Sequence, residues 1–172
     1  MTPSVSSLYV GSVIAAGGAL LFNIAPPHLS DLNVLLGLLA TTALLSVFKL
    51  RLPLAQGSST MTMAYTVDFL ALILNEIDTA MWLGALAVLI QCTIRVKRRQ
   101  PIHRAAFSAA AVVIAVQVAG LVWRSLDGNM ANVAMATTVL PLVASVATYF
   151  LVNTSLVVGA IAVTAGVSLT EA

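Results

Sequence analysis

Long apolar runs separated by short polar stretches dominate the pattern of this 172-residue chain. A helix that crosses a bilayer needs about 20 mostly apolar residues, and Pro, Gly, Ser or clustered charges between such runs mark loops. The runs predict six transmembrane helices, at about residues 8–25, 32–48, 61–74, 79–96, 105–123 and 142–166. The fold class is therefore expected to be all-α, a polytopic membrane protein with a single transmembrane helical domain over residues 1–172.

The last apolar stretch, residues 131–167, is too long for one crossing. As a straight helix it would measure about 55 Å, against a hydrocarbon core of about 30 Å. It either folds as a tight hairpin or combines one span with a separate short element. Pro141 is a natural helix break, and it favours a short apolar segment at 131–140 followed by one long helix from 142 to 166.

The basic residues are distributed asymmetrically along the chain. With six spans and both termini in the cytoplasm, seven of the eight Lys and Arg residues lie on the cytoplasmic side and only Arg124 lies outside. This is the excess that the positive-inside rule describes. Five of them fall between Arg95 and Arg104, around the loop KRRQPIHR, which would also meet anionic lipids well. Trp82 and Trp123 are predicted to lie at the outer ends of their spans, at the boundary between membrane and water, where aromatic residues are enriched.

Composition excludes a water-soluble domain and most enzyme classes. The chain is 60% hydrophobic and 8% charged, whereas soluble domains carry about 25% charged residues. A basic cluster in so apolar a chain is more typical of a cytoplasmic loop than of a nucleic-acid site. The lone Cys92 and the well-separated His28 and His103 offer neither a disulfide framework nor metal-ligand spacing. Because phosphate loops and nucleophile motifs are also missing from the sequence, no enzyme activity, cofactor, metal or nucleic-acid partner is expected.

Asp68 is the strongest site candidate, because it lies midway along the third predicted span. A carboxyl at that depth costs about 2.5–3.5 kcal/mol on insertion scales and usually faces the protein interior. Tyr65 shares its helix face. Polar partners are predicted on three other spans: Gln91, Gln117, Tyr149 and Asn153. Together they would line a polar cavity for a small ligand. The alternative is that they only clamp the helices together by hydrogen bonds.

A ridge of small residues is predicted in the first span. Gly11, Ala15 and Ala19 recur at four-residue spacing, and such ridges let helices approach closely. The ridge is interpreted either as internal packing or as a docking face for a partner helix.

From Phe48 onward the sequence resembles an integral-membrane sensor module, usually the N-terminal part of bacterial cyclic-di-GMP signalling proteins with GGDEF or HD-GYP output domains. The pieces that carry the resemblance are FKLRLPLAQGSSTMTMAYTVDF (48–69), RAAF (104–107), the turn near Asp127-Gly128, and YFLVNTSLV (149–157). Ser108 and Asn75-Glu76 depart from the family's usual Asn and Gly-Pro turn. The resemblance implies a multi-pass protein of the bacterial cytoplasmic membrane. It would control a cytoplasmic cyclic-di-GMP or kinase output domain and commonly work as a homodimer.

Two other function classes remain open. The chain also resembles the substrate-binding subunits of energy-coupling-factor vitamin transporters, which dock to a transmembrane partner through small residues of the first helix. Ala15 and Ala19 fit that pattern. The third class is a structural or oligomerising membrane module without a ligand. An output domain encoded downstream would favour the sensor, and neighbouring genes for a pair of ATPases and a coupling subunit would favour transport.

Overall fold

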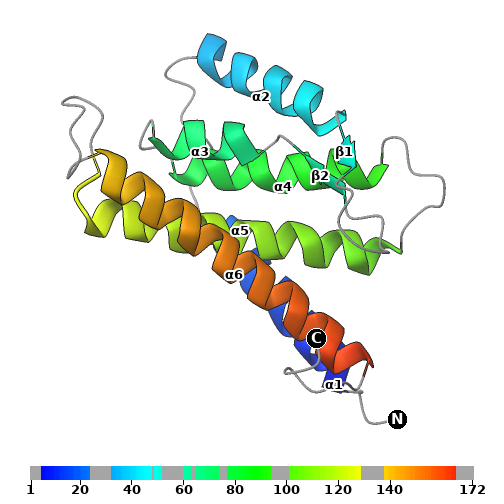
Figure 1. Ribbon diagram of the computed structural model, residues 1–172. Coiled ribbons are helices and arrows are strands. Elements are labelled where there is room, and N and C mark those ends of the chain that lie inside the picture. The colour runs from blue at the N-terminus through cyan, green and yellow to red at the C-terminus, as the bar shows by residue number, and fades with distance from the viewer. Residues whose placement is uncertain are drawn as a thin grey trace.

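The computed structural model describes residues 5–23, 32–47, 49–51, 60–62, 65–73, 77–93, 101–128 and 138–165. Six helices and two short strands account for most of these residues (Figure 1). Their bounds are α1 (Val5–Asn23), α2 (Leu32–Val47), β1 (Lys49–Arg51), β2 (Thr60–Thr62), α3 (Tyr65–Ile73), α4 (Ile77–Thr93), α5 (Ile102–Ser125) and α6 (Leu140–Ala165). Each predicted span overlaps one helix, so the expected helical class is confirmed.

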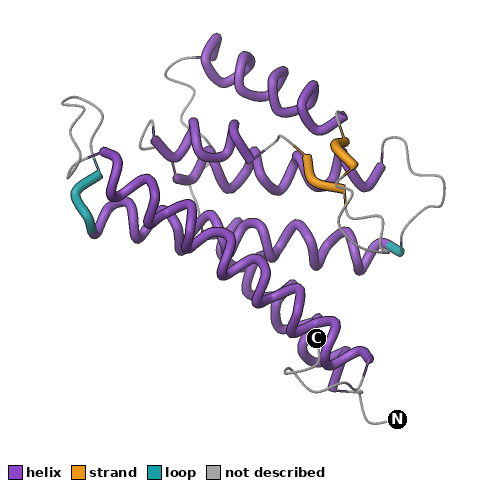
Figure 2. The backbone as a smooth tube through the Cα atoms, viewed as in Figure 1, coloured by secondary structure: helices purple, strands orange, loops and turns teal. Residues whose placement is uncertain are grey.

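The third helix begins later than expected, because a short β-hairpin precedes it. β2 pairs antiparallel with β1, with Lys49 opposite Thr62 and Arg51 opposite Thr60 (Figure 2). The prediction that a helical span starts at Met61 was therefore wrong. Polar and apolar residues alternate through β2, which is the period of a strand, and β-branched Thr favours strands. That leaves α3 with nine residues.

Within the part of the chain that the structure describes, three helices are long and apolar enough to cross a membrane: α1, α5 and α6, with 19, 24 and 26 residues. The apolar helices α2 and α4 are shorter, with 16 and 17 residues. α3 rises only about 14 Å, against a hydrocarbon core of about 30 Å. α3 therefore does not cross the core on its own.

α5 is the central helix and packs on α1, α4 and α6 (Figure 1). Small residues allow this. A Cβ atom at Gly17 of α1 would lie 2.6 Å from the Cβ of Ala110, and one at Gly120 would lie 2.7 Å from Ile77 of α4. Half of the apolar stretch of α5 is buried, against 11% in α1 and in α6. α5 thus faces protein, whereas α1 and α6 turn most of their apolar surface outward, as lipid-facing helices do.

Two helices begin earlier than the pattern predicts. Ile77 and Asp78, expected in a turn, open α4, and Ile77 is buried. His103 and Arg104, expected in the basic loop, belong to the first turn of α5. Pro101 occupies the N-cap position of α5, and a proline is tolerated there because its missing N–H would have no acceptor within the helix.

The end of α5 confirms the predicted polar turn. The Gly128 N–H donates to the Trp123 carbonyl (2.9 Å) and the Asp127 N–H to the Arg124 carbonyl (3.1 Å). Asp127 has a φ of 52°, so the pair forms a Schellman turn with Asp in the left-handed position. Trp123 is only 1% exposed, so it packs inside the protein rather than facing lipid headgroups as expected. Trp82 is 41% exposed.

α6 is the long helix that the sequence predicted at 142–166, but Pro141, expected to break the chain before it, lies inside it. It starts at Leu140 and holds Pro141 in its first turn, directly after a short π-helical turn at 138–139. A first-turn proline sacrifices no intrahelical hydrogen bond. Of the predicted short segment at 131–140, residues 131–137 lie outside the described residues.

Candidate functional site

The six residues predicted to bind a ligand are distributed over four helices. Asp68 on α3 and Tyr149 on α6 are buried, at 3% and 1% exposure. The ring of Phe69, next to Asp68, meets the Tyr149 ring edge-on with centroids 5.3 Å apart. Asn153 is half-buried one turn beyond Tyr149 on the same helix face. Tyr65 opens α3, and its side chain lies outside the described residues.

Asp68 lies where α3, α4 and α5 meet. A Cβ atom at Gly84 of α4 would be 3.4 Å from Asp68 Oδ2 and 2.8 Å from Val112 Cγ1 of α5, so the glycine makes room for the carboxyl. Gln91 lies two turns beyond Gly84 on α4, about 10 Å along the axis. Gln117 follows Val112 by five residues, which turns it about 140° around α5 and away from the face that carries Val112. Helix geometry therefore separates the Asp68 carboxyl from both amides, whereas Tyr149 contacts the neighbouring Phe69.

Buried hydroxyls accompany the carboxyl. The side chains of Thr42 on α2 and Ser145 on α6 are fully buried. Their hydroxyls and Asp68 Oδ1 have no hydrogen-bond partner among the residues that the structure describes. The larger apolar cluster takes its side chains from the same helices, α2 to α6. A buried unsatisfied polar atom costs about 1–3 kcal/mol. We call this region, centred on Asp68, Gly84 and Val112, the closed core.

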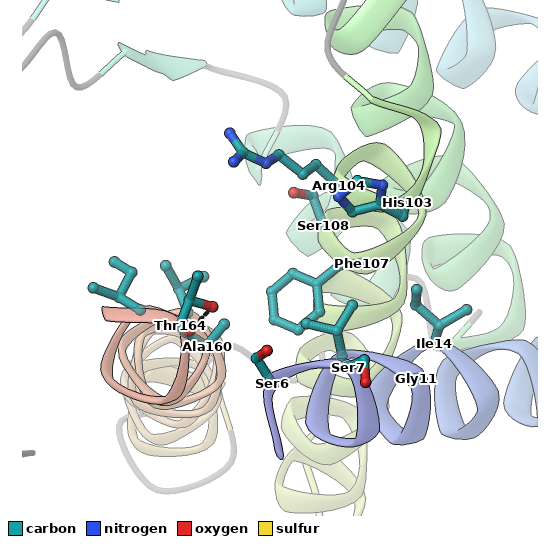
Figure 3. A pocket seen from close by; sticks show the side chains of 13 residues that line it. Ser6, Ser7, Gly11, Ile14, His103, Arg104, Phe107, Ser108, Ala160 and Thr164 are labelled. Carbon is teal, nitrogen blue, oxygen red and sulfur yellow. Dashed lines mark hydrogen bonds between the residues drawn. The ribbon is translucent and has the colours of Figure 1, made fainter. Parts of the chain in front are cut away.

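A separate cavity of about 860 Å³ lies between α1, α5 and α6 (Figure 3). It is at the end of the bundle where α1 and α5 begin and α6 ends. Residues within 6–14, 103–108 and 157–164 line it, thirteen in all. None of the six predicted ligand residues is among these thirteen. We call this cavity the terminal groove.

One side of the terminal groove carries the Arg104 cation, the His103 ring and a hydroxyl. His103 and Arg104, both exposed, lie together on the first turn of α5, and Ser108 follows one turn later (Figure 3). Ser6 and Ser7 of α1 lie on the opposite side. The thirteen described residues that line the groove include no acidic side chain. The groove therefore has a positive potential at this end.

The remaining wall of the terminal groove is apolar. Beside this wall a hydrogen bond joins α1 to α6. The Phe107 ring projects into the middle of the groove (Figure 3). Tyr9 of α1 lies 6.4 Å from that ring, centroid to centroid, and its hydroxyl donates to the Leu156 carbonyl of α6 at 3.0 Å. Gly159 makes this bond sterically feasible, because a Cβ there would lie 2.6 Å from the Tyr9 hydroxyl oxygen.

The predicted small-residue ridge is not the face of α1 that packs on α5. Gly11, Ala15 and Ala19 are all exposed, and nothing lies within 4 Å of a Cβ built at Gly11. Gly17, against Ala110, makes the close contact instead. Of the ridge, Gly11 lines the terminal groove.

The pattern of the sequence did not identify the terminal groove, although one signal was present. Pro101 directly before an apolar run marks a helix N-terminus. A helix beginning there would place Arg104, Phe107 and Ser108 on neighbouring positions of one side. No sequence signal indicates that Ser6 lines the groove, since its position there depends on how α1 crosses α5.

Among the residues that the structure describes, His, Cys, Asp and Glu side chains form no group of three or more that could hold a metal ion. Compared with protein-family models, curated proteins and solved structures, the chain matches none of them.

Proposed function

We propose that this chain is the membrane-embedded input module of a bacterial signalling protein, with the terminal groove as its ligand-responsive site. The observation that carries the proposal is the course of α6. In its first half the side chains of Ser145 and Tyr149 are buried, and in its last half Val157, Ala160, Ile161 and Thr164 line the terminal groove. One continuous helix about 39 Å long therefore connects the two regions. A change in the groove would move the end of α6.

The proposed topology has six membrane-crossing segments with both termini in the cytoplasm. α1 and α5 begin at the end of the bundle where α6 finishes, as this topology requires. His103 and Arg104 lie at that end and Arg124 lies at the other end of α5, which fits the positive-inside rule. In this topology α3 belongs to the third crossing, although α3 alone is too short to complete it. β2 stays at the cytoplasmic boundary, where it pairs with Lys49 and Arg51 of β1. The bacterial cytoplasmic membrane is the proposed location.

Signalling by such a module needs two arrangements of α1, α5 and α6 with different ligand affinities, because a ligand shifts an equilibrium only through differential binding. The Tyr9 hydrogen bond to Leu156 is a contact that would differ between them, since it joins the two helices beside the groove. In proteins of the family that the sequence resembles, a cyclic-di-GMP or kinase output domain follows the last helix and commonly acts as a dimer.

The gene and the full-length protein test this proposal. We expect the reading frame to continue beyond Ala172 into a GGDEF, HD-GYP or kinase domain, and a stop codon at that point contradicts the sensor. In the full-length protein, Gly11→Leu fills the terminal groove and should change the turnover of the output domain. Gly18→Leu is the matched control, because a Cβ there also meets nothing within 4 Å but Gly18 does not line the groove. Equal turnover in the two variants contradicts a groove-linked output.

Labelling of single cysteines tests the orientation. In a Cys92→Ser background, Leu8→Cys and Ile102→Cys place exposed thiols at the groove end, and Leu126→Cys places one at the opposite end. A membrane-impermeant maleimide added to intact cells should label only Leu126→Cys. Labelling of the other two positions from outside contradicts cytoplasmic termini.

A second candidate function is a substrate-binding subunit of a vitamin transporter of the energy-coupling-factor type. The observation that favours it is the exposure of Gly11, Ala15 and Ala19, which leaves their ridge on α1 open to a partner helix. Neighbouring genes for two ATPases and a coupling subunit are expected in that case. Ala15→Leu combined with Ala19→Leu should then abolish co-purification with the co-expressed coupling subunit without lowering the melting temperature. Retained co-purification contradicts docking through this ridge.

A further inference from the structure

We infer that the terminal groove binds an anionic phospholipid, with the phosphodiester at Arg104 and an acyl chain along Phe107. The inference rests on the membrane orientation in the proposed function, because it needs the groove at a lipid headgroup level. It does not require a signalling role.

The cationic side of the groove supplies the headgroup contact. The Arg104 side chain extends past Ser108, and its guanidinium reaches away from the His103 ring, which lies closer to the helix (Figure 3). A planar guanidinium matches two phosphate oxygens with parallel N–H donors. Both residues lie on the first turn of α5, where the helix dipole is positive. No lining side chain among the thirteen described is acidic, so no carboxylate in the groove competes with a phosphate.

The apolar wall argues for an amphiphile rather than a small soluble anion. Beyond Arg104 the groove is lined by Phe107, Val157 and Ile161, together with Val10 and Ile14 of α1. Inorganic phosphate would satisfy the arginine and leave this surface uncovered, whereas an acyl chain would bury it. The volume of about 860 Å³ lies in the range of about 300–1,000 Å³ that is usual for ligand pockets. It can hold a headgroup with part of a chain.

The location of the groove selects the lipid class. In the proposed orientation the groove opens at the cytoplasmic boundary, next to the segment that carries most of the basic residues. Basic pockets between transmembrane helices on that side recognise anionic headgroups, and the cytoplasmic leaflet carries such lipids. Ser108, one turn from Arg104, and Ser6 and Ser7 across the groove are positioned for the phosphodiester and glycerol oxygens of such a lipid.

Native mass spectrometry of the detergent-solubilised protein tests the charge requirement. The protein is titrated with phosphatidylglycerol and, separately, with phosphatidylcholine of the same acyl chains. We expect retention of the anionic lipid, and Arg104→Gln should weaken its apparent affinity about tenfold, the loss of one charge-assisted contact. Arg124→Gln is the matched control, since Arg124 is also exposed and lies on the last turn of the same helix. It should bind like the parent protein.

A second pair of variants tests the shape requirement independently of charge. Gly11→Leu places a side chain in the groove without a clash, and Gly18→Leu places one on the same helix outside it. We expect only Gly11→Leu to weaken binding of phosphatidylglycerol. Melting temperatures of all four variants show whether each is folded, and none replaces a buried residue.

Three results would overturn the inference: equal binding of the two lipids, equal affinities within either variant pair, or competition by glycerol 3-phosphate at the concentration of the lipid. The last result would assign the groove to a soluble phosphate ester. If lipid binding fails while Gly11→Leu still changes the output of the full-length protein, the input function stands and its ligand is of another class. If lipid binds and the output does not respond, the proposed signalling role fails alone.

Discussion

The closed core and the terminal groove share the helix α5, but the closed core is packed and the terminal groove is open. At the closed core, Gly84 lets α4 approach α5 and Asp68 closely, and apolar side chains fill the surroundings. At the groove end the closest approach is made by Gly17 and Ala110. Beyond it, the larger side chains of Phe107 and Arg104 project from α5 into a cavity of about 860 Å³. Glycine and alanine at the crossing points thus decide where these helices touch and where they separate.

The largest effect on stability is expected from crowding the contact between α1 and α5. Gly17→Leu puts a side chain where Ala110 Cβ and backbone atoms lie within 3 Å of the new Cβ, and backbone cannot yield as a side chain can. We expect a loss of about 3 kcal/mol or more in the free energy of unfolding, measured by thermal unfolding in detergent. Gly18→Leu, its neighbour with open space around it, should unfold like the parent. Equal melting temperatures would show that α1 does not pack on α5 through Gly17.

An intermediate effect is expected at the closed core. Gly84→Ala brings a methyl group within 2.8 Å of Val112 Cγ1 and should lower the free energy of unfolding by about 1–3 kcal/mol. Val112→Ala removes that methyl, so the double variant should lose less than the sum of the single losses. Additive losses in a double-mutant cycle would argue against direct contact between α4 and α5 at this point.

The smallest effect is expected beside the groove, where one hydrogen bond joins α1 to α6. Tyr9→Phe removes the hydroxyl that donates to the Leu156 carbonyl, at a cost of about 1 kcal/mol. Gly159→Ala crowds the same hydroxyl, so Tyr9→Phe should partly rescue it. Hydrogen exchange should rise in α1 and the last half of α6 and stay unchanged at the closed core. Increased exchange in α3 and α4 would show that the two regions are not separable.

Much of the fold could be predicted because the lengths of the apolar runs, and the polar, Pro and Gly residues that separate them, can be read directly from the sequence. The helices, the length of α6 and the turn at Asp127 all follow from them, whereas the break expected at Pro141 does not occur. The start of α3 could not be predicted from apolarity alone, because residues 60–62 are held by pairing with residues 49–51. The alternation of Thr and Met there was the only local sign of a strand.

The candidate site was less predictable than the fold. The burial of Asp68 follows from the cost of exposing a carboxyl to lipid, and its neighbour Phe69 contacts the Tyr149 ring. The amides fit the composition of a polar site but not its position: Gln91 lies about 10 Å further along α4, and Gln117 lies about 140° around α5. The terminal groove depends on the angles at which α1, α5 and α6 cross. An alanine-rich helix offers many contact points, so its sequence does not fix those angles.

Spin-label distances in lipid nanodiscs test most directly the claim that the terminal groove responds and the closed core does not. In a Cys92→Ser background, Ile102→Cys with Ser155→Cys reports on α5 and α6 at the groove end, and Leu86→Cys with Leu121→Cys reports on α4 and α5; all four positions are exposed. On replacing zwitterionic with anionic lipid, we expect the first distance distribution to shift and narrow while the second stays unchanged. An unchanged first distribution, or an equal shift in both, would contradict the account.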